Sequence, residues 1–156
     1  MPKPDALPTE RDFDPFGGCL DARYAWKMFG GLTLDQARAV FREDPLNRQE
    51  DFMFMGGRAF AYYFPVVEDH LRGVADGSYY DRQARILARC IELQFSNSPL
   101  EPGVLRLAPR VLALADHVRG HLEGFASDED ERRKIAEAWD ETAKTVESAV
   151  REQLQQ

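Results

Sequence analysis

The amino-acid sequence predicts an all-α fold, a single-domain bundle of about five to seven helices that ends in a long C-terminal helix. Three observations lead to this prediction. Apolar residues recur at three- and four-residue steps in every long segment, and residues that cap helix starts recur between these segments. No strand-like alternation bounded by hairpin turns occurs. With 156 residues, 44% hydrophobic and 30% charged, the chain has the length and composition of one globular domain.

The N-terminal segment differs from the rest of the chain in composition. Residues 1–18 contain four prolines and two glycines, which favour extended or mobile backbone over helix. We therefore expect a flexible tail over residues 1–18, pinned by Phe13 and Phe16. The all-helical domain is expected to comprise residues 19–156.

The first two helices of this domain have clear end signals. Residues 19–29 suit a short helix, which Gly30 and Gly31 would end through a left-handed cap. Thr33 and Gln36 have the spacing of a capping box, in which the hydroxyl and the amide each satisfy a free backbone N–H group. This pair predicts a helix over residues 34–43.

Two prolines, Pro45 and Pro65, affect where the next two predicted helices begin and break. Asp44 and Pro45 repeat the start signal, because the carboxylate can cap the helix and proline fits its first turn. The helix that they start is expected to end at Gly56-Gly57. In the following helix, over residues 58–71, Pro65 removes one backbone hydrogen bond and crowds the preceding turn. We expect a kink or a break there.

The C-terminal half predicts three longer helices. Residues 79–96 carry a wide apolar stripe, typical of a central helix contacted on two sides, whose members include Tyr80, Ala84, Leu87, Ile91 and Phe95. Pro109 suits the first turn of the next helix. Ser127 is predicted to cap the last one, which begins with four acidic residues and extends to Leu154. Such a helix would be roughly 40 Å long, so its last turns would project or pair with another chain.

The last helix also carries a short seam of apolar residues. Its members alternate three- and four-residue steps, as in a coiled coil: Ala136, Trp139, Ala143, Val146 and Val150. Either the domain's own core or another chain must cover the large apolar surface of Trp139. The spacing alone leaves both roles open.

Charge and composition exclude several classes of function. The net charge is −7, which repels phosphate backbones and anionic lipid headgroups, so we expect neither nucleic acid nor membrane as a partner. Cys19 and Cys90 lack metal-ligand spacing and are too few for a disulfide framework, which fits a reducing cytoplasm. No signal-peptide or membrane-spanning apolar run occurs. These features predict a cytoplasmic protein.

One histidine pair has metal-ligand spacing. His117 and His121 stand four residues apart on a predicted helix, and Glu68 and Asp69 could add carboxylate ligands from another helix. This set would suit a small metal-dependent hydrolase. The sequence favours solvated histidines instead, because the glutamate of a His-Glu-x-x-His motif is missing and Arg119 disfavours a dication. No phosphate loop, serine elbow, Cys-x-x-Cys pair or EF-hand occurs, so we predict no cofactor and no metal.

Two adjacent carboxylates precede four apolar residues. Burial of Glu50 or Asp51 would raise its pKa, and such an acid could act as a general base. The favoured alternative is an ion pair with Arg48 or Arg58 that anchors two helices. Further along the chain, Tyr62 could open onto a groove.

Three basic residues share one face of the predicted helix over residues 79–96. Arg82, Arg85 and Arg89 could together bind a carboxylate or a phosphate group. Intrahelical ion pairs, such as Arg89 with Glu92, are the favoured alternative.

Residues 29–33, 48–55 and 60–65 read Phe-Gly-Gly-Leu-Thr, Arg-Gln-Glu-Asp-Phe-Met-Phe-Met and Phe-Ala-Tyr-Tyr-Phe-Pro. In these segments the chain resembles small, uncharacterised bacterial all-helical proteins, over roughly residues 26–72. The resemblance implies a bacterial source and carries no catalytic residue. Small acidic bacterial proteins of this kind often look like immunity proteins for toxins.

These features together predict a non-catalytic, acidic protein-binding module, an immunity- or antitoxin-type inhibitor of a basic partner such as a nuclease. The negative charge lies at the ends of the chain, −3 over residues 1–55 and −4 over residues 127–156, and would speed encounter with such a partner. The alternatives are the metal-dependent hydrolase and a structural homo-oligomer, for instance a homodimer joined through the last helix. The candidate partner-binding residues are Glu50, Asp51, Arg58, Tyr62 and Trp139.

Overall fold

The computed structural model describes residues 6–74 and 81–155, and every regular element in these ranges is helical. The longer helices are α2 (Leu20–Phe29), α3 (Leu34–Glu43), α6 (Gly57–Arg72), α7 (Asp81–Phe95), α9 (Ala108–Gly120) and α11 (Glu129–Leu154). The four-residue helices are α1 (Glu10–Phe13), α4 (Pro45–Arg48), α5 (Asp51–Phe54), α8 (Pro102–Leu105) and α10 (Leu122–Phe125). The all-α class and the long C-terminal helix are confirmed. The number of helical segments exceeds the predicted five to seven, because single turns form where longer helices or loops were expected.

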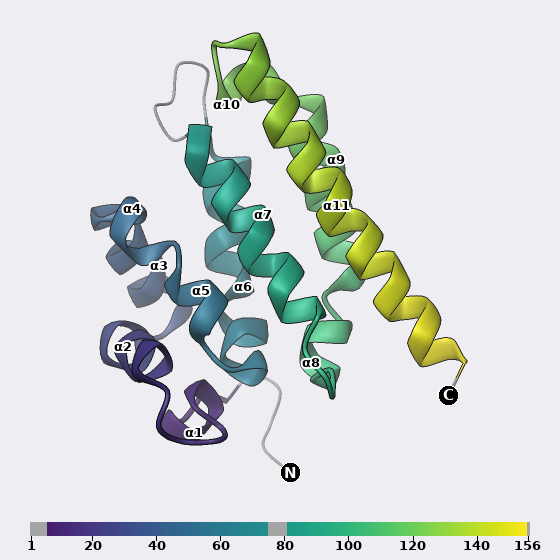
Figure 1. The fold of residues 1–156 in the computed structure, drawn as a ribbon. Coiled ribbons are helices and arrows are strands. Elements are labelled where there is room, and N and C mark those ends of the chain that lie inside the picture. Colours follow the sequence, from purple (N-terminus) through teal and green to yellow (C-terminus); the bar gives the residue numbers. More distant parts are fainter. Residues whose placement is uncertain (1–5, 75–80, 156) are drawn as a thin grey trace.

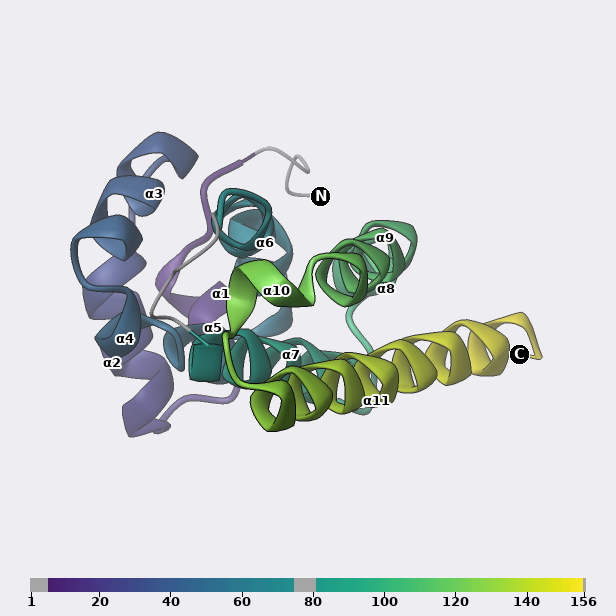
Figure 2. The same ribbon diagram turned by 90° about the horizontal axis from the view of Figure 1, so that it is seen from above.

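The helices pack in three layers (Figures 1 and 2). On one side lie α2 and α3, the middle contains α6 and α7, and the other side contains α9 and α11. Contacts of α7 with α5 on one side and α11 on the other make it the central helix that its wide apolar stripe predicts. Tyr80, assigned to that stripe, lies outside the described residues.

The segment before α2 is more ordered than the flexible tail that its prolines and glycines predict. Thr9 and Asp12 form a capping box that starts α1, and Phe13 is fully buried. The backbone N–H of Gly56 donates to the Phe13 oxygen at 2.8 Å, which ties α1 to the end of α5. Phe16 is not pinned, since 94% of it is exposed.

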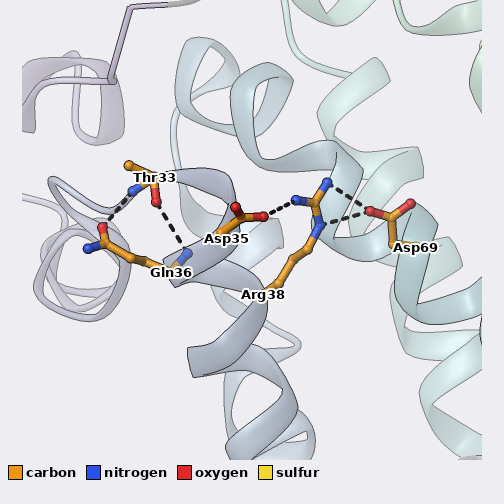
Figure 3. Close-up of polar contacts among 5 residues, drawn as sticks. All are labelled: Thr33, Asp35, Gln36, Arg38 and Asp69. Carbon is orange, nitrogen blue, oxygen red and sulfur yellow. Dashed lines mark hydrogen bonds and ion pairs between the residues drawn. The ribbon is translucent and has the colours of Figure 1, made fainter.

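Local signals around α3 act as predicted. The left-handed backbone after α2 falls on Gly31, with φ of 76°, rather than on Gly30. The capping box of Thr33 and Gln36 is present at the start of α3 (Figure 3). One turn on, the Arg38 guanidinium bonds to Asp35 in the same helix and to Asp69 of α6, which links the outer and middle layers.

Two of the proline predictions differ from the structure. The helix that Pro45 starts is interrupted, so that α4 and α5 flank Gln49 and Glu50. Pro65 interrupts nothing, because α6 is one continuous helix with Pro65 inside it. Buried residues on both sides of the proline, Phe64 and Val66, hold α6 against its neighbours, and their packing offsets the lost backbone bond.

Helix α11 closes the core against α7 and α9. Its N-cap is Asp128, whose side chain accepts a hydrogen bond from the Asp130 N–H group, and not Ser127 as predicted. Its apolar face buries Trp139 completely. At 26 residues the helix is about 39 Å long, and its last turns extend past α7 and α9 (Figures 1 and 2), with Leu154 81% exposed.

Candidate functional site

A buried ion pair lies where α4 passes into α5. Arg48 is the last residue of α4 and Asp51 the first of α5, and they are only 7% and 5% exposed. The Arg48 Nη1 and Asp51 Oδ2 atoms are 3.5 Å apart, and neither makes a hydrogen bond. Of the two favoured partners, Arg48 is therefore the one that pairs with an acid here. We call these two residues, with Gln49 between them, the Arg48–Asp51 cluster.

Burial dominates the electrostatics of this cluster. Loss of hydration raises the pKa of Asp51 to about 6, although the positive charge of Arg48 acts in the opposite direction and the neighbouring Glu50 adds to the rise. The same burial raises the pKa of the nearby Cys90 thiol to about 12, so this cysteine stays protonated near neutral pH. Of the two adjacent carboxylates, Asp51 is the one with the raised pKa, and it also forms the ion pair that the sequence favoured.

Tyr24 of α2 lies at the outer side of the cluster. The Arg48 Nη2 group donates a hydrogen bond to the Tyr24 hydroxyl at 3.1 Å, and the guanidinium carbon is 5.3 Å from the centre of its ring. Tyr24 itself is 47% exposed. One aromatic side chain therefore contacts both the buried arginine and the solvent.

Gln94 of α7 fixes α5 from the inner side. This side chain is buried, and its amide nitrogen donates to the backbone oxygens of Phe52 at 3.0 Å and Met55 at 2.7 Å. The Cys90 thiol donates to the Gln49 oxygen at 3.5 Å, one turn earlier on α7. These bonds satisfy carbonyl groups that so short a helix leaves free, and they hold the α4–α5 segment against the central layer.

Exposed apolar side chains occur on α2, on the segment just before it and on α5. Phe16 precedes α2, Leu20 and Tyr24 lie one turn apart on it, and Phe54 lies on α5, which packs against α2. The exposed carboxylate of Glu50 lies one helical turn before Phe54. We call Phe16, Leu20, Tyr24, Glu50 and Phe54 the α2–α5 face.

The other candidate partner-binding residues lie elsewhere. Arg58 forms ion pairs with Asp12 at 3.7 Å and Glu101 at 3.5 Å, so it joins α6 to two other segments. Tyr62 is half-buried, and its ring packs edge-on against that of Tyr63. Of the two roles left open for Trp139, the structure shows the core one.

The histidine pair is not joined by the proposed carboxylates. The rings of His117 and His121 stack with centres 4.2 Å apart, and the His121 Nδ1 atom lies 2.7 Å from the His117 backbone oxygen. Glu68 is paired with Arg110 and Asp69 with Arg38. Among the described residues, no group of three or more histidine, cysteine or acidic side chains is placed to hold a metal ion.

Two arginines of α7, Arg85 and Arg89, bind carboxylates within the protein. Arg89 pairs with Glu92 at 2.6 Å, as the intrahelical alternative predicts. Arg85 pairs at 2.6 Å with Glu131 of α11, a partner that helical spacing could not indicate. For these two residues, the contacts are those of helix stabilisation and packing.

A polar groove of about 660 Å³ lies among the described residues. It lies between the loop after α7 and the last turns of α11, with Phe95, Leu100 and Ala149 among its lining residues and Lys144 and Glu152 on its α11 side. Local sequence patterns do not reveal this groove, because loop placement depends on tertiary contacts.

The α2–α5 face was also missed, although one signal for it exists. Leu20 and Tyr24 are spaced one turn apart, opposite the buried Ala22, Ala25 and Phe29.

No helix in the described part of the chain is both long and apolar enough to cross a membrane. No protein-family model matches this chain, and neither a curated protein nor a solved structure is significantly similar to it.

Proposed function

We propose that the protein is a non-catalytic protein-binding module, an immunity- or antitoxin-type bacterial inhibitor that covers the surface of a basic partner with its α2–α5 face. The observation that carries the proposal is the exposure of Leu20, Tyr24 and Phe54 on α2 and α5, two helices that pack together, and of Phe16 just before α2. Clusters of exposed apolar and aromatic side chains mark interaction surfaces more often than scattered ones do.

Charge supports a basic partner. The net charge of −7 attracts a positively charged partner at long range. Glu50 and Asp21 place exposed carboxylates next to the apolar residues of the α2–α5 face. Arg23 and Lys27 also lie exposed on α2, so the charge along this helix is mixed. Attraction by the whole molecule therefore affects the association rate, and contact with the apolar residues sets the dissociation rate.

The partner-binding test compares matched surface variants. The wild-type protein serves as bait in the native host, and the captured protein is purified so that its dissociation constant can be measured directly. We expect Leu20→Ser together with Tyr24→Ser to weaken binding at least tenfold. Leu154→Ser is the control, because Leu154 is 81% exposed at the far end of α11. Equal affinities of all three proteins, or loss of binding in the control alone, would overturn the assignment of this face.

Charge variants test the choice of a basic partner. Glu50→Lys with Asp21→Lys should lower the association rate, and Arg23→Glu with Lys27→Glu should raise it, with both effects fading at high salt. The opposite pattern would indicate an acidic partner. Sedimentation of the free protein tests the homo-oligomer alternative, since a stable dimer lost in the Leu20/Tyr24 variant would assign the face to self-association.

A further inference from the structure

The groove between α11 and the loop after α7 has one straight wall. Residues 96–100 form one side of the groove, and the last turns of α11 form the straight wall on the other. Six residues of α11 line this wall, at the spacing of one side of a helix: Lys144, Thr145, Ser148, Ala149, Glu152 and Gln153. From Lys144 to Glu152 the wall measures about 12 Å. The groove therefore runs along α11 for about two helical turns.

The charges on this wall make it complementary to a second copy of itself. Its two charged residues have opposite signs and lie two turns apart, with Lys144 at one end and Glu152 at the other. The uncharged side chains of Thr145, Ser148 and Ala149 lie between them. When two such walls meet antiparallel, each lysine faces the glutamate of the other copy. The contact then contains the same ion pair twice.

Both charged side chains are available for such a contact. Lys144 pairs with Glu141 at 3.6 Å, and the Lys144 side chain is 72% exposed, so this intrahelical pair adds little stability. Glu152 is exposed and forms no ion pair with any residue that the structure describes. The residues between the two charges are small, which allows a second helix to approach at the usual axis separation of about 8 to 10 Å.

We propose that the groove is filled by the α11 end of a second copy of this chain, packed antiparallel about a two-fold axis near Ser148. Residues equally distant from Ser148 then face each other across the axis, and Lys144 of each copy pairs with Glu152 of the other. The groove of each copy receives the helix of the other, so the two contacts are equivalent.

The remaining charges in the overlap do not oppose this register. The two helices overlap over residues 141–155, which contain three further charged residues. Each of these faces an uncharged residue of the other copy: Glu141 faces Gln155, Glu147 faces Ala149 and Arg151 faces Thr145. Like charges therefore do not meet at the contact. The net charge of −7 on each copy adds only a long-range repulsion that salt screens.

The contact is small, so the dimer forms only at high protein concentration. Two short helix segments cover far less than the roughly 1,600 Å² of a standard interface, and we expect a dissociation constant on the order of 100 μM. Because α2 and α11 lie on opposite sides of the molecule (Figures 1 and 2), the α2–α5 face of each copy stays uncovered. The dimer therefore presents two such faces to a partner.

Sedimentation equilibrium of the whole protein, from about 10 μM to about 1 mM, tests the dimer. Lys144→Glu and Glu152→Lys should each weaken it about tenfold or more, since either change places like charges opposite each other twice. An equimolar mixture of these two variants should restore association, because each lysine again faces a glutamate. The double variant should restore it for the same reason.

Glu137→Lys is the matched control for the charge change. It changes the net charge by the same amount as Glu152→Lys, at an exposed position of α11 outside the overlap. Since it only reduces the long-range repulsion, it should dimerise at least as well as the wild-type protein. In ¹⁵N NMR spectra of the wild-type protein, dilution should shift the backbone amide signals of Thr145 and Ser148 and leave those of Leu20 and Tyr24 unchanged.

Several outcomes would overturn the proposal. The wild-type protein could stay monomeric up to about 1 mM, which would leave the groove to an occupant other than a second copy. The single variants could dimerise as the wild-type protein does, or the mixture and the double variant could fail to recover the dimer. Loss of the dimer in the variant with Leu20→Ser and Tyr24→Ser would assign self-association to the α2–α5 face instead.

Discussion

The indole Nε1 group of Trp139 donates a hydrogen bond to the backbone oxygen of Ala84, 3.1 Å away and 55 positions earlier in the chain. One turn further on, the Thr142 hydroxyl donates to the Ala88 oxygen at 2.9 Å. Both donors are fully buried, so the fold would be destabilised if either donor lost its acceptor. These two bonds join α11 to α7 along the interface that their apolar faces form.

Replacing Trp139 by alanine should lower the free energy of unfolding by about 3 to 5 kcal/mol, because a large buried ring leaves a cavity. Urea unfolding followed by circular dichroism measures the change. The molecular mass in solution should stay the same, since Trp139 lies in the core. A variant of normal stability but altered mass would contradict the core assignment.

Gln94→Leu should cost about 1 to 3 kcal/mol, because the buried oxygens of Phe52 and Met55 lose their side-chain donor. Gln153→Leu, at an exposed position near the end of α11, is the matched control. Thermal melts of both variants check the prediction. Equal midpoints would mean that α5 is held by its apolar contacts alone.

The N-cap of α11 can be tested by comparing the effects of alanine substitutions at two adjacent residues, Asp128 and Ser127, on stability. Asp128→Ala should destabilise the protein by about 0.5 to 2 kcal/mol, since the Asp130 N–H group loses its acceptor. Ser127→Ala should leave the unfolding midpoint unchanged, because Ser127 is exposed and lies before the cap. The reverse order of the two effects would place the helix start one residue earlier.

The raised pKa of Asp51 determines how its contribution to stability varies with pH. The folded protein holds the Asp51 proton more tightly than the unfolded chain, so this contribution is complete below about pH 4 and is lost as the pH rises through about 6. Relative to Asp51→Asn, the wild-type protein should lose up to about 3 kcal/mol between pH 4 and pH 8. Paired urea titrations at several pH values measure this difference, and a wild-type protein that loses stability relative to Asp51→Asn on acidification would refute the sign.

Metal removal should leave the melting midpoint unchanged, because the carboxylates of Glu68 and Asp69 are bound by Arg110 and Arg38 and not directed to His117 and His121. Melts with and without EDTA, together with elemental analysis, check this expectation. Stoichiometric metal that is lost in His121→Ala would instead favour the hydrolase alternative.

Local signals in the sequence predicted the fold where the responsible groups are close along the chain. The capping box of Thr33 and Gln36 lies within one turn, and its outcome needs no distant contact. Asp128 and Ser127 are both good caps, so spacing could not choose between them. The order around α1 was missed because proline and glycine content outweighed the Thr9 capping box and the burial of Phe13 by residues far along the chain.

The candidate site was predicted only in part for the same reason. The pairing of an acid with Arg48 follows from a three-residue spacing, and burial follows from the apolar residues after it. Tyr24 contacts the cluster, and Gln94 holds the adjacent α5, from positions more than twenty residues away, which no periodicity in one sequence reveals. The position of Trp139 required the same long-range information.

The central position of α7 has a consequence for how the chain assembles as it is made. Gln94 of α7 binds the α5 segment, which is synthesised before it. The opposite side of α7 contacts Trp139, which the ribosome adds later. Between these two events a nascent chain exposes the apolar residues of α7 and α9 that α11 later covers. During this interval of synthesis, chaperones would bind an incomplete chain whose core residues are exposed. Premature termination would release such a chain.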